Sequence, residues 1–149
     1  MYMYPRIGAT ISTVDAIQLC NNYGLYRVSR KIMEDPSKYR SWCFDGVSGL
    51  PDVLNSWIGD GFNITYKCAL PHDLAYGYGA AGDSASRRSV DRTFRENLIK
   101  EGGVGTIKAY ICWSAVRFLG SERLGLSFSW GFADRYRYSL SDNPLSIAL

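Results

Sequence analysis

The stretch from Cys68 to Tyr76 contains the only histidine of the 149-residue chain, His72, which is followed at once by Asp73. If this stretch is helical, His72 and Tyr76 lie one turn apart on the same face, and Asp73 lies about 100° around the helix from His72. An imidazole with an unperturbed pKa near ~6.5 is a natural general base at neutral pH, and a carboxylate is a hard oxygen ligand of the kind that Ca²⁺ binds. One turn of helix would therefore present a base and a metal ligand together.

Pro71 restricts where this central helix can begin. A proline inside a helix costs about 3 kcal/mol unless it lies in the first turn. The helix therefore either begins near Leu70 or is kinked just before His72. In the first case the positive end of the helix dipole lowers the tendency of His72 to be protonated, which would favour its use as a base.

A second helix is predicted to follow the connector 77–83, capped by Asp83 or Ser84 and closed by glycines after residue 101. It carries Asp91 on the same face as two apolar side chains further along. At ~1.5 Å per residue, His72 lies about four residues before the connector and Asp91 about eight after it. The mismatch is about one turn, which the connector can absorb, so we expect the two side chains to meet.

The segment 72–76, His-Asp-Leu-Ala-Tyr, resembles the His-Asp-x-x-Tyr helix of the calcium-dependent phospholipases A2. In that family a second aspartate, on the next and antiparallel helix, orients the histidine, and the segment 90–94, Val-Asp-Arg-Thr-Phe, resembles that second site. The resemblance covers roughly residues 43–98. It implies a mainly α fold in which an antiparallel helix pair carries the site, with His72, Asp91 and Tyr76 as catalytic residues.

The turn-rich segment 43–52 resembles, more loosely, the loop that supplies backbone carbonyls to Ca²⁺ in the same family. Glycines permit backbone dihedrals that turn carbonyl oxygens inward, and Ca²⁺ collects six to eight oxygens. The family's tight Tyr-Gly-Cys loop is missing, however, and residues 53–71 separate this segment from His72, so a plain surface loop is the alternative. The metal ligands implied by the resemblance are Asp73, Gly46, Ser48, Gly49 and, through its side chain, Asp45.

The resemblance implies hydrolysis of the sn-2 ester of a phospholipid. His72 would take a proton from the attacking water, Asp91 would hold the imidazole in the right tautomer, and Ca²⁺ would polarise the ester carbonyl. Tyr76 would hydrogen-bond to Asp91. The alternative is a catalytically inactive, phospholipase A2-like module that binds lipid or a partner, and a third reading is an unrelated domain in which His72 and Asp91 lie far apart.

Composition limits the class of protein and its partners. A chain of 149 residues suits one domain, 1–149, and 46% hydrophobic with 21% charged residues excludes wholesale disorder. A net charge of +3 is too small to indicate nucleic-acid binding but suits a phospholipid membrane surface, the partner implied by the resemblance. If the protein is a toxin, an inhibitor protein is expected as a further partner.

The four cysteines, Cys20, Cys43, Cys68 and Cys112, contain no Cys-x-x-Cys spacing. They would form either two disulfides in an exported protein or buried thiols in the cytosol. The first residues lack the pattern of a signal peptide, and no apolar run approaches the ~18 residues of a membrane span. We expect a soluble chain that is secreted or delivered by another route, or that stays in the cytoplasm.

Three further elements are predicted outside the central pair. Residues 12–24 read as an N-terminal helix that Ser12 or Thr13 can cap, and residues 106–119 read as a C-terminal helix. In the latter, the apolar stripe of Ile107, Tyr110, Ile111 and Phe118 is expected to pack in the core. Residues 124–132 alternate large apolar side chains with Gly or Ser, which predicts a short strand or hairpin with a covered or an exposed apolar face.

Overall fold

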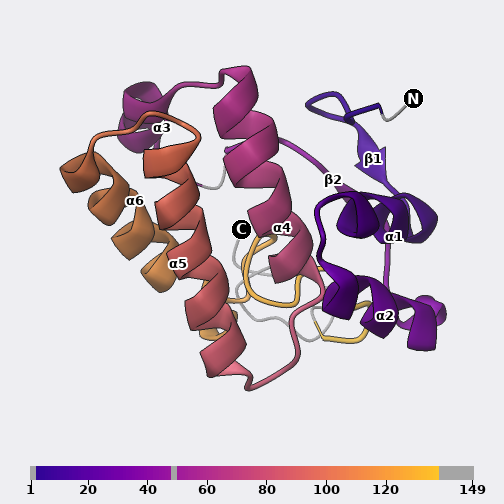
Figure 1. Cartoon of the computed structure of the whole chain (residues 1–149). Helices are drawn as coiled ribbons and strands as arrows, with labels where there is room; N and C mark the ends of the chain where they lie inside the picture. The colour runs from indigo at the N-terminus through magenta and orange to yellow at the C-terminus, as the bar shows by residue number, and fades with distance from the viewer. Residues whose placement is uncertain (1–2, 48–49, 138–149) are drawn as a thin grey trace.

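A computed structural model of the chain describes residues 3–47 and 50–137 (Figure 1). The mainly α-helical class predicted from the sequence is confirmed, with a small two-stranded antiparallel sheet in addition. The α-helices are α1 (Thr13–Asn22), α2 (Tyr26–Glu34), α3 (Asp52–Ile58), α4 (Leu70–Gly77), α5 (Ser84–Lys100) and α6 (Thr106–Leu119). Strands β1 (Thr10–Ile11) and β2 (Trp42–Cys43) pair, and shorter helical pieces are the 3₁₀-helices Pro36–Lys38 and Glu122–Leu124 and the π-helix Asn63–Ala69.

Local signals set the start of α1 and of α5. Before α1, the Ser12 hydroxyl accepts a hydrogen bond from the Asp15 amide, while the Asp15 carboxylate accepts one from the Ser12 amide. This reciprocal pair satisfies amides that a helix start otherwise leaves without partners. The Asp83 carboxylate caps α5 by a single bond, which it accepts from the Ser86 amide. Both caps were among those predicted from the sequence.

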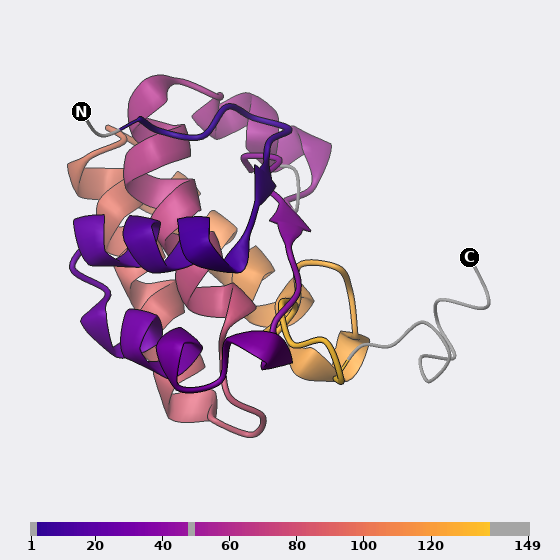
Figure 2. The same ribbon diagram turned by 90° about the vertical axis from the view of Figure 1, so that its right-hand side faces the viewer.

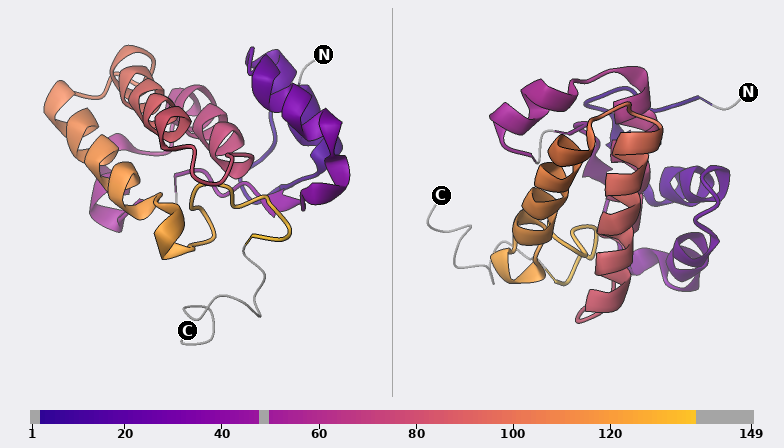
Figure 3. Two further views of the ribbon diagram at one scale, coloured as in Figure 1. Left: turned by 90° about the horizontal axis from the view of Figure 1, so that it is seen from below. Right: turned by 60° about the vertical axis from the view of Figure 1, so that its left-hand side comes forward.

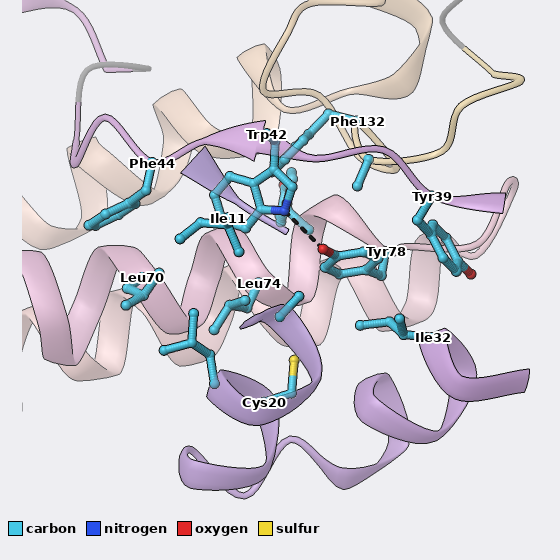
Figure 4. Packing of buried hydrophobic residues seen from close by; sticks show 14 of the residues in the cluster. Ile11, Cys20, Ile32, Tyr39, Trp42, Phe44, Leu70, Leu74, Tyr78 and Phe132 are labelled. Atoms are coloured by element: carbon cyan, nitrogen blue, oxygen red, sulfur yellow. Dashed lines mark hydrogen bonds between the residues drawn. The ribbon is translucent and has the colours of Figure 1, made fainter. Parts of the chain in front are cut away.

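The buried side chains form two clusters, and the polypeptide around α4 contributes to both. The first cluster joins α1, α2, the sheet and the turn near Phe132 to Leu70, Leu74 and Tyr78 (Figure 4). Within it the Trp42 indole N–H donates to the Tyr78 hydroxyl at 2.9 Å, so neither buried polar group is left unsatisfied. The second cluster joins α3, α5 and α6 to Ile64 and Cys68 of the π-helix.

These clusters explain the arrangement of the helices. Helices α1 and α2 pack against each other on one side of α4, with α1 in contact with α4 (Figure 2). Helix α5 lies beside α4 on the other side, and α6 packs against α5 (Figures 1 and 3). Helix α4 is thus held between two packed layers, which fixes the direction in which its side chains point.

Helical backbone reaches α4 through the π-helix rather than starting at Leu70. The Leu70 amide donates to the Thr65 carbonyl five residues earlier, and Ala69 has helical dihedrals of φ −71° and ψ −51°. Pro71 therefore lies where wide π-turns meet the α-helix, which accommodates its missing N–H. Of the two alternatives for the helix start, the one in which a free helix end acts on His72 is wrong, because two turns of helical backbone precede His72.

The predicted strand at 124–132 is not present. Gly125 and Gly131 have φ of +59° and +82°, which breaks any extended run there. The amides of Trp130 and Ala133 instead donate to the carbonyls of Gly120 and Gly77, at the ends of α6 and α4. The segment is a series of turns that closes over these helix ends, because its backbone hydrogen bonds go to helices rather than to a second strand.

The core-facing side of α6 also differs from the prediction. Its buried residues are the small or medium-sized Ala109, Cys112 and Val116, whereas Ile107 and Phe118 are 79% and 71% exposed. Small side chains allow α6 to approach α5 closely. The large apolar residues at helical spacing therefore lie on the outer face of this helix, and the prediction that they pack in the core is wrong for Ile107 and Phe118.

The structure leaves the cysteines unpaired. All four cysteines are free thiols, of which Cys20, Cys68 and Cys112 are buried and Cys43 is exposed. Burial raises the pKa of the Cys20 and Cys68 thiols to about 12 and also raises that of Cys112.

Within residues 3–47 and 50–137 no helix is long and apolar enough to cross a membrane.

We predict that one thiol per folded chain reacts quickly with a disulfide reagent at pH 8. Cys43 is accessible, while the other three are buried and hold their protons, so little thiolate is present to react. Absorbance titration should count one fast thiol in the native protein and four in denaturant. Cys43→Ser should remove the fast reaction, and two fast thiols in the folded parent would contradict this description.

Candidate active site

The structure brings His72 of α4 and Asp91 of α5 into contact. His72 Nε2 lies 3.0 Å from Asp91 Oδ1, and the Tyr76 hydroxyl donates to the same oxygen at 2.7 Å. The three residues named from the sequence as catalytic therefore form one hydrogen-bonded group. The connector between α4 and α5 absorbs the difference in helix position, as expected.

The second carboxylate oxygen of Asp91 is bound by two arginines that sequence reasoning did not connect with the site. Arg117 Nη1, from α6, lies 2.7 Å from Asp91 Oδ2, and Arg87 Nη1 lies 3.6 Å from it. A buried carboxylate requires a cation nearby, and this requirement could have pointed to Arg117. Arg117 is the only arginine of α6. The sequence does not show which face of α6 meets α5.

These donors explain how the charge of Asp91 is tolerated. The side chain has 0% exposure, and burial by itself raises the pKa of a carboxyl group. Hydrogen bonds from His72, Tyr76 and Arg117 outweigh burial, so the pKa of Asp91 lies below its usual range. Asp91 is therefore a carboxylate at neutral pH.

His72 is packed on both faces, and its two ring nitrogens face different carboxylates. Its side chain is 10% exposed, and its ring lies between those of Tyr76 and Phe94, with centroids 4.4 and 4.6 Å away. Nε2 faces Asp91, and Nδ1 lies 3.7 Å from Asp73 Oδ1. Because Asp91 is ionised, the favoured neutral tautomer carries its proton on Nε2 and leaves the Nδ1 lone pair free.

Opposing effects act on the proton affinity of His72. Burial lowers the pKa of its imidazole, but the neighbouring carboxylates of Asp73 and Asp91 outweigh burial and raise the pKa above its ordinary value. The ring thus keeps a proton to higher pH than a free imidazole does. A cation bound to Asp73 would oppose this effect.

Asp73 combines partial exposure with a second carboxylate nearby. Its side chain is 25% exposed, and its pKa is raised mainly by burial and also by the charge of Asp45. Asp45 is itself exposed, in the turn that contains Gly46, whose φ is +72°. Two of the predicted metal ligands, Ser48 and Gly49, lie outside the described residues.

A hollow of about 430 Å³ adjoins the predicted metal-binding turn. Asp45 and Gly46 line it, but neither His72 nor Asp73 does, so it lies beside the turn rather than over the base. Its other lining residues are Ile7, Val47, Asn55, Ser56, Gly59, Asp60 and Thr65.

No group of three or more His, Cys, Asp or Glu side chains is close enough to hold a metal in the part of the chain that the structure describes. A Ca²⁺ site would therefore depend on backbone carbonyls in addition to Asp73 and Asp45. Such carbonyls are ordinary Ca²⁺ ligands.

Comparisons of the chain with protein-family models, with curated proteins and with solved structures found no match in any of the three. The residues around His72 and Asp91 are therefore the basis on which a function can be inferred.

We predict that Tyr76→Phe lowers the free energy of unfolding by about 1–3 kcal/mol, because a buried carboxylate loses one of its donors. The Tyr76 hydroxyl also accepts from Arg87 Nη1 at 3.0 Å, so a second bond is lost. Urea denaturation measures the change. Tyr26→Phe, at a tyrosine that is 63% exposed, is the control and should leave the midpoint unchanged; equal stability of the two variants would contradict the proposed role of the hydroxyl.

Proposed function

We propose that the protein is a calcium-dependent phospholipase A2 that hydrolyses the sn-2 ester of phospholipids. The observation that carries this proposal is the position of His72 between two carboxylates, with Nε2 on Asp91 and Nδ1 toward Asp73. One carboxylate is fully buried and can orient the ring, while the other is partly exposed and can bind a cation. The packing of α4 beside α5 supports a phospholipase A2-like helix pair.

The chemistry assigned to His72 follows from its hydrogen bonds. With the proton on Nε2 directed to Asp91, Nδ1 accepts a proton from a water molecule whose oxygen attacks the ester carbonyl carbon. The resulting imidazolium is stabilised by the Asp91 carboxylate. When the tetrahedral intermediate collapses, the proton on Nδ1 passes to the departing alkoxide, which leaves as the lysophospholipid while the fatty acid is released.

The residues around Asp73 fit a calcium ion in part. Two carboxylates, Asp73 and Asp45, are close enough for the charge of one to raise the pKa of the other, a repulsion that a divalent cation would relieve. Carboxylates and the carbonyls of a glycine-containing turn such as that of Gly46 are the hard oxygen donors that Ca²⁺ prefers. Bound there, Ca²⁺ would supply Lewis-acid polarisation of the ester carbonyl.

A lipid surface as the partner is supported by an apolar rim made of Met3, Tyr4, Ile7 and Phe62. All four side chains are exposed, by between 37% and 82%. Ile7 lines the hollow next to Gly46, and the rings of Tyr4 and Phe62 pack edge to face at 5.3 Å. The rim thus borders the proposed metal-binding turn, where it could enter the interfacial region of a bilayer.

We predict that His72→Gln lowers calcium-dependent fatty-acid release from mixed phospholipid vesicles by at least ~10²-fold, the usual contribution of a general base. Glutamine can still donate to Asp91, so the fold should survive, as circular dichroism can verify. Arg92→Gln, at an exposed position next to Asp91, is the matched control and should keep activity.

The calcium requirement is tested in the same assay. Release by the parent should disappear with chelator and return with added Ca²⁺. Equal release in chelator would refute the calcium part of the proposal, and equal release by His72→Gln would refute the base.

We predict that Ile7→Asp weakens binding to phospholipid vesicles and lowers the rate on vesicles by about tenfold, while the rate on a monomeric short-chain ester stays within about twofold. Vesicle co-sedimentation and parallel kinetics measure these effects. Met33→Asp, at an apolar residue of α2 that is 55% exposed, is the matched control. An equal loss on both substrates would show that Ile7 acts on the site and not on the lipid surface.

The second candidate is a catalytically inactive, phospholipase A2-like module that binds lipid or a partner. The hollow beside the Gly46 turn favours it, since neither His72 nor Asp73 lines that hollow, and a ligand bound there would lie away from the base. A folded parent that binds vesicles but releases no fatty acid, with or without Ca²⁺, would support this function instead.

A further inference from the structure

The Asp91 carboxylate is bound on its two oxygens by donors of different kinds. Oδ1 faces His72 and Tyr76 of α4, at 3.0 and 2.7 Å. Oδ2 faces the Arg117 guanidinium of α6, at 2.7 Å. Rotation about the bond between Cβ and Cγ of an aspartate is only weakly restricted by itself. A bond to the second oxygen therefore decides in which plane the first oxygen is presented to His72.

We propose that Arg117 is a positioning residue, which holds Oδ2 of Asp91 so that Oδ1 stays directed at His72 Nε2. Its part in catalysis rests on the proposed function, whereas the orientation of the ring does not. Helix α6 supplies none of the residues assigned to base or metal. By this inference it belongs to the site nonetheless, because it controls the carboxylate that orients the base.

Arg117 is better placed for this task than Arg87, the other arginine near Asp91. Arg87 Nη1 lies 3.6 Å from Oδ2 and 3.0 Å from the Tyr76 hydroxyl. Its Nη2 donates to the backbone carbonyl of Arg117 at 2.8 Å. Arg87 thus ties the last turn of α6 to α5, and this places the Arg117 side chain over the carboxylate.

The last turn of α6 also meets α4 closely. A Cβ atom on Gly120 would lie 2.6 Å from the Tyr76 hydroxyl oxygen, so the missing side chain is what allows this approach. The amide of Trp130 donates to the Gly120 carbonyl and that of Gly131 to the Tyr76 carbonyl, which fastens the ends of both helices. Arg117 therefore approaches Asp91 from a rigid support rather than from a loop.

The choice of arginine has a chemical reason. The guanidinium is planar and permanently charged, and its side chain is only 23% exposed. A lysine would keep the charge and one hydrogen bond, whereas an apolar side chain such as Met would leave Oδ2 with only the longer contact to Arg87. The two kinds of substitution should therefore differ in their effect on His72.

The test uses the fact that His72 is the only histidine, so every imidazole signal in a nitrogen-15 NMR spectrum belongs to it. At one fixed pH, the parent should show the Nε2–H tautomer and a slowly exchanging Nε2 proton. Arg117→Met should speed exchange of that proton by at least about tenfold, the factor expected when a charge-assisted bond is lost. Arg117→Lys should restore exchange to within about threefold of the parent.

Arg95→Met is the matched control. Arg95 belongs to α5, and it stacks over the rings of Tyr110 and Trp113 of α6, with its guanidinium carbon 4.4 and 5.2 Å from their centroids. Arg95→Met removes a comparable stacked arginine but no donor to Asp91, so the His72 signals should stay as in the parent.

The outcomes separate this inference from the proposed function. A folded Arg117→Met variant with parent-like tautomer and exchange overturns the positioning role, whatever the activity. If Arg117→Met does not fold, Arg117→Gln takes its place: its amide offers only a shorter, uncharged donor, so exchange should still rise by more than about twofold, and exchange within about twofold of the parent overturns the role. If the protein is the proposed enzyme, kcat on vesicles should fall about tenfold in Arg117→Met with KM unchanged. Altered His72 signals in a protein without turnover would support the positioning role and refute the enzyme.

Discussion

The buried charge of Asp91 is the constraint on which the packing of α4, α5 and α6 depends. A carboxylate with 0% exposure is stable only if its oxygens are bonded, and here the hydrogen-bond donors to this α5 residue come from the two neighbouring helices, α4 and α6. Two of them bind Oδ1 from α4, and Arg117 binds Oδ2 from α6. A shift of one helix against another would break at least one bond to a buried charge, so this group sets the register of the three helices.

The position of α4 follows from the two hydrophobic clusters rather than from its own stability. The helix itself is short and contains Pro71, yet Leu70, Leu74 and Tyr78 are buried on one side while residues of the preceding π-helix pack on the other. Because both sides are covered, His72 and Tyr76 are directed toward α5. The wide turns before Pro71 let the helical backbone continue upstream without a break.

The exposure of the ionisable side chains increases across the site, from the buried Asp91 to the exposed Asp45. Asp91 is ionised and enclosed, His72 is 10% exposed, and Asp73 is 25% exposed beside the exposed Asp45. Burial raises the pKa of Asp73, and the neighbouring carboxylates raise the pKa of the His72 imidazole. The exposed end of the site is therefore the one that carries two carboxylates, Asp73 and Asp45.

The sequence alone determined the features that depend on near neighbours in the chain. The capping pattern of Ser12 and Asp15, the extent of α5 and α6, and the shared face of His72 and Tyr76 follow from local hydrogen bonds and from the helical period. The meeting of His72 with Asp91 was also predictable, because one short connector links their helices. Tertiary structure alone decided that Arg117 binds Asp91, that α6 buries Ala109 rather than Ile107, and that residues 124–132 form turns. Each of these depends on which distant surface a segment packs against, and neither periodicity nor local propensity specifies that surface.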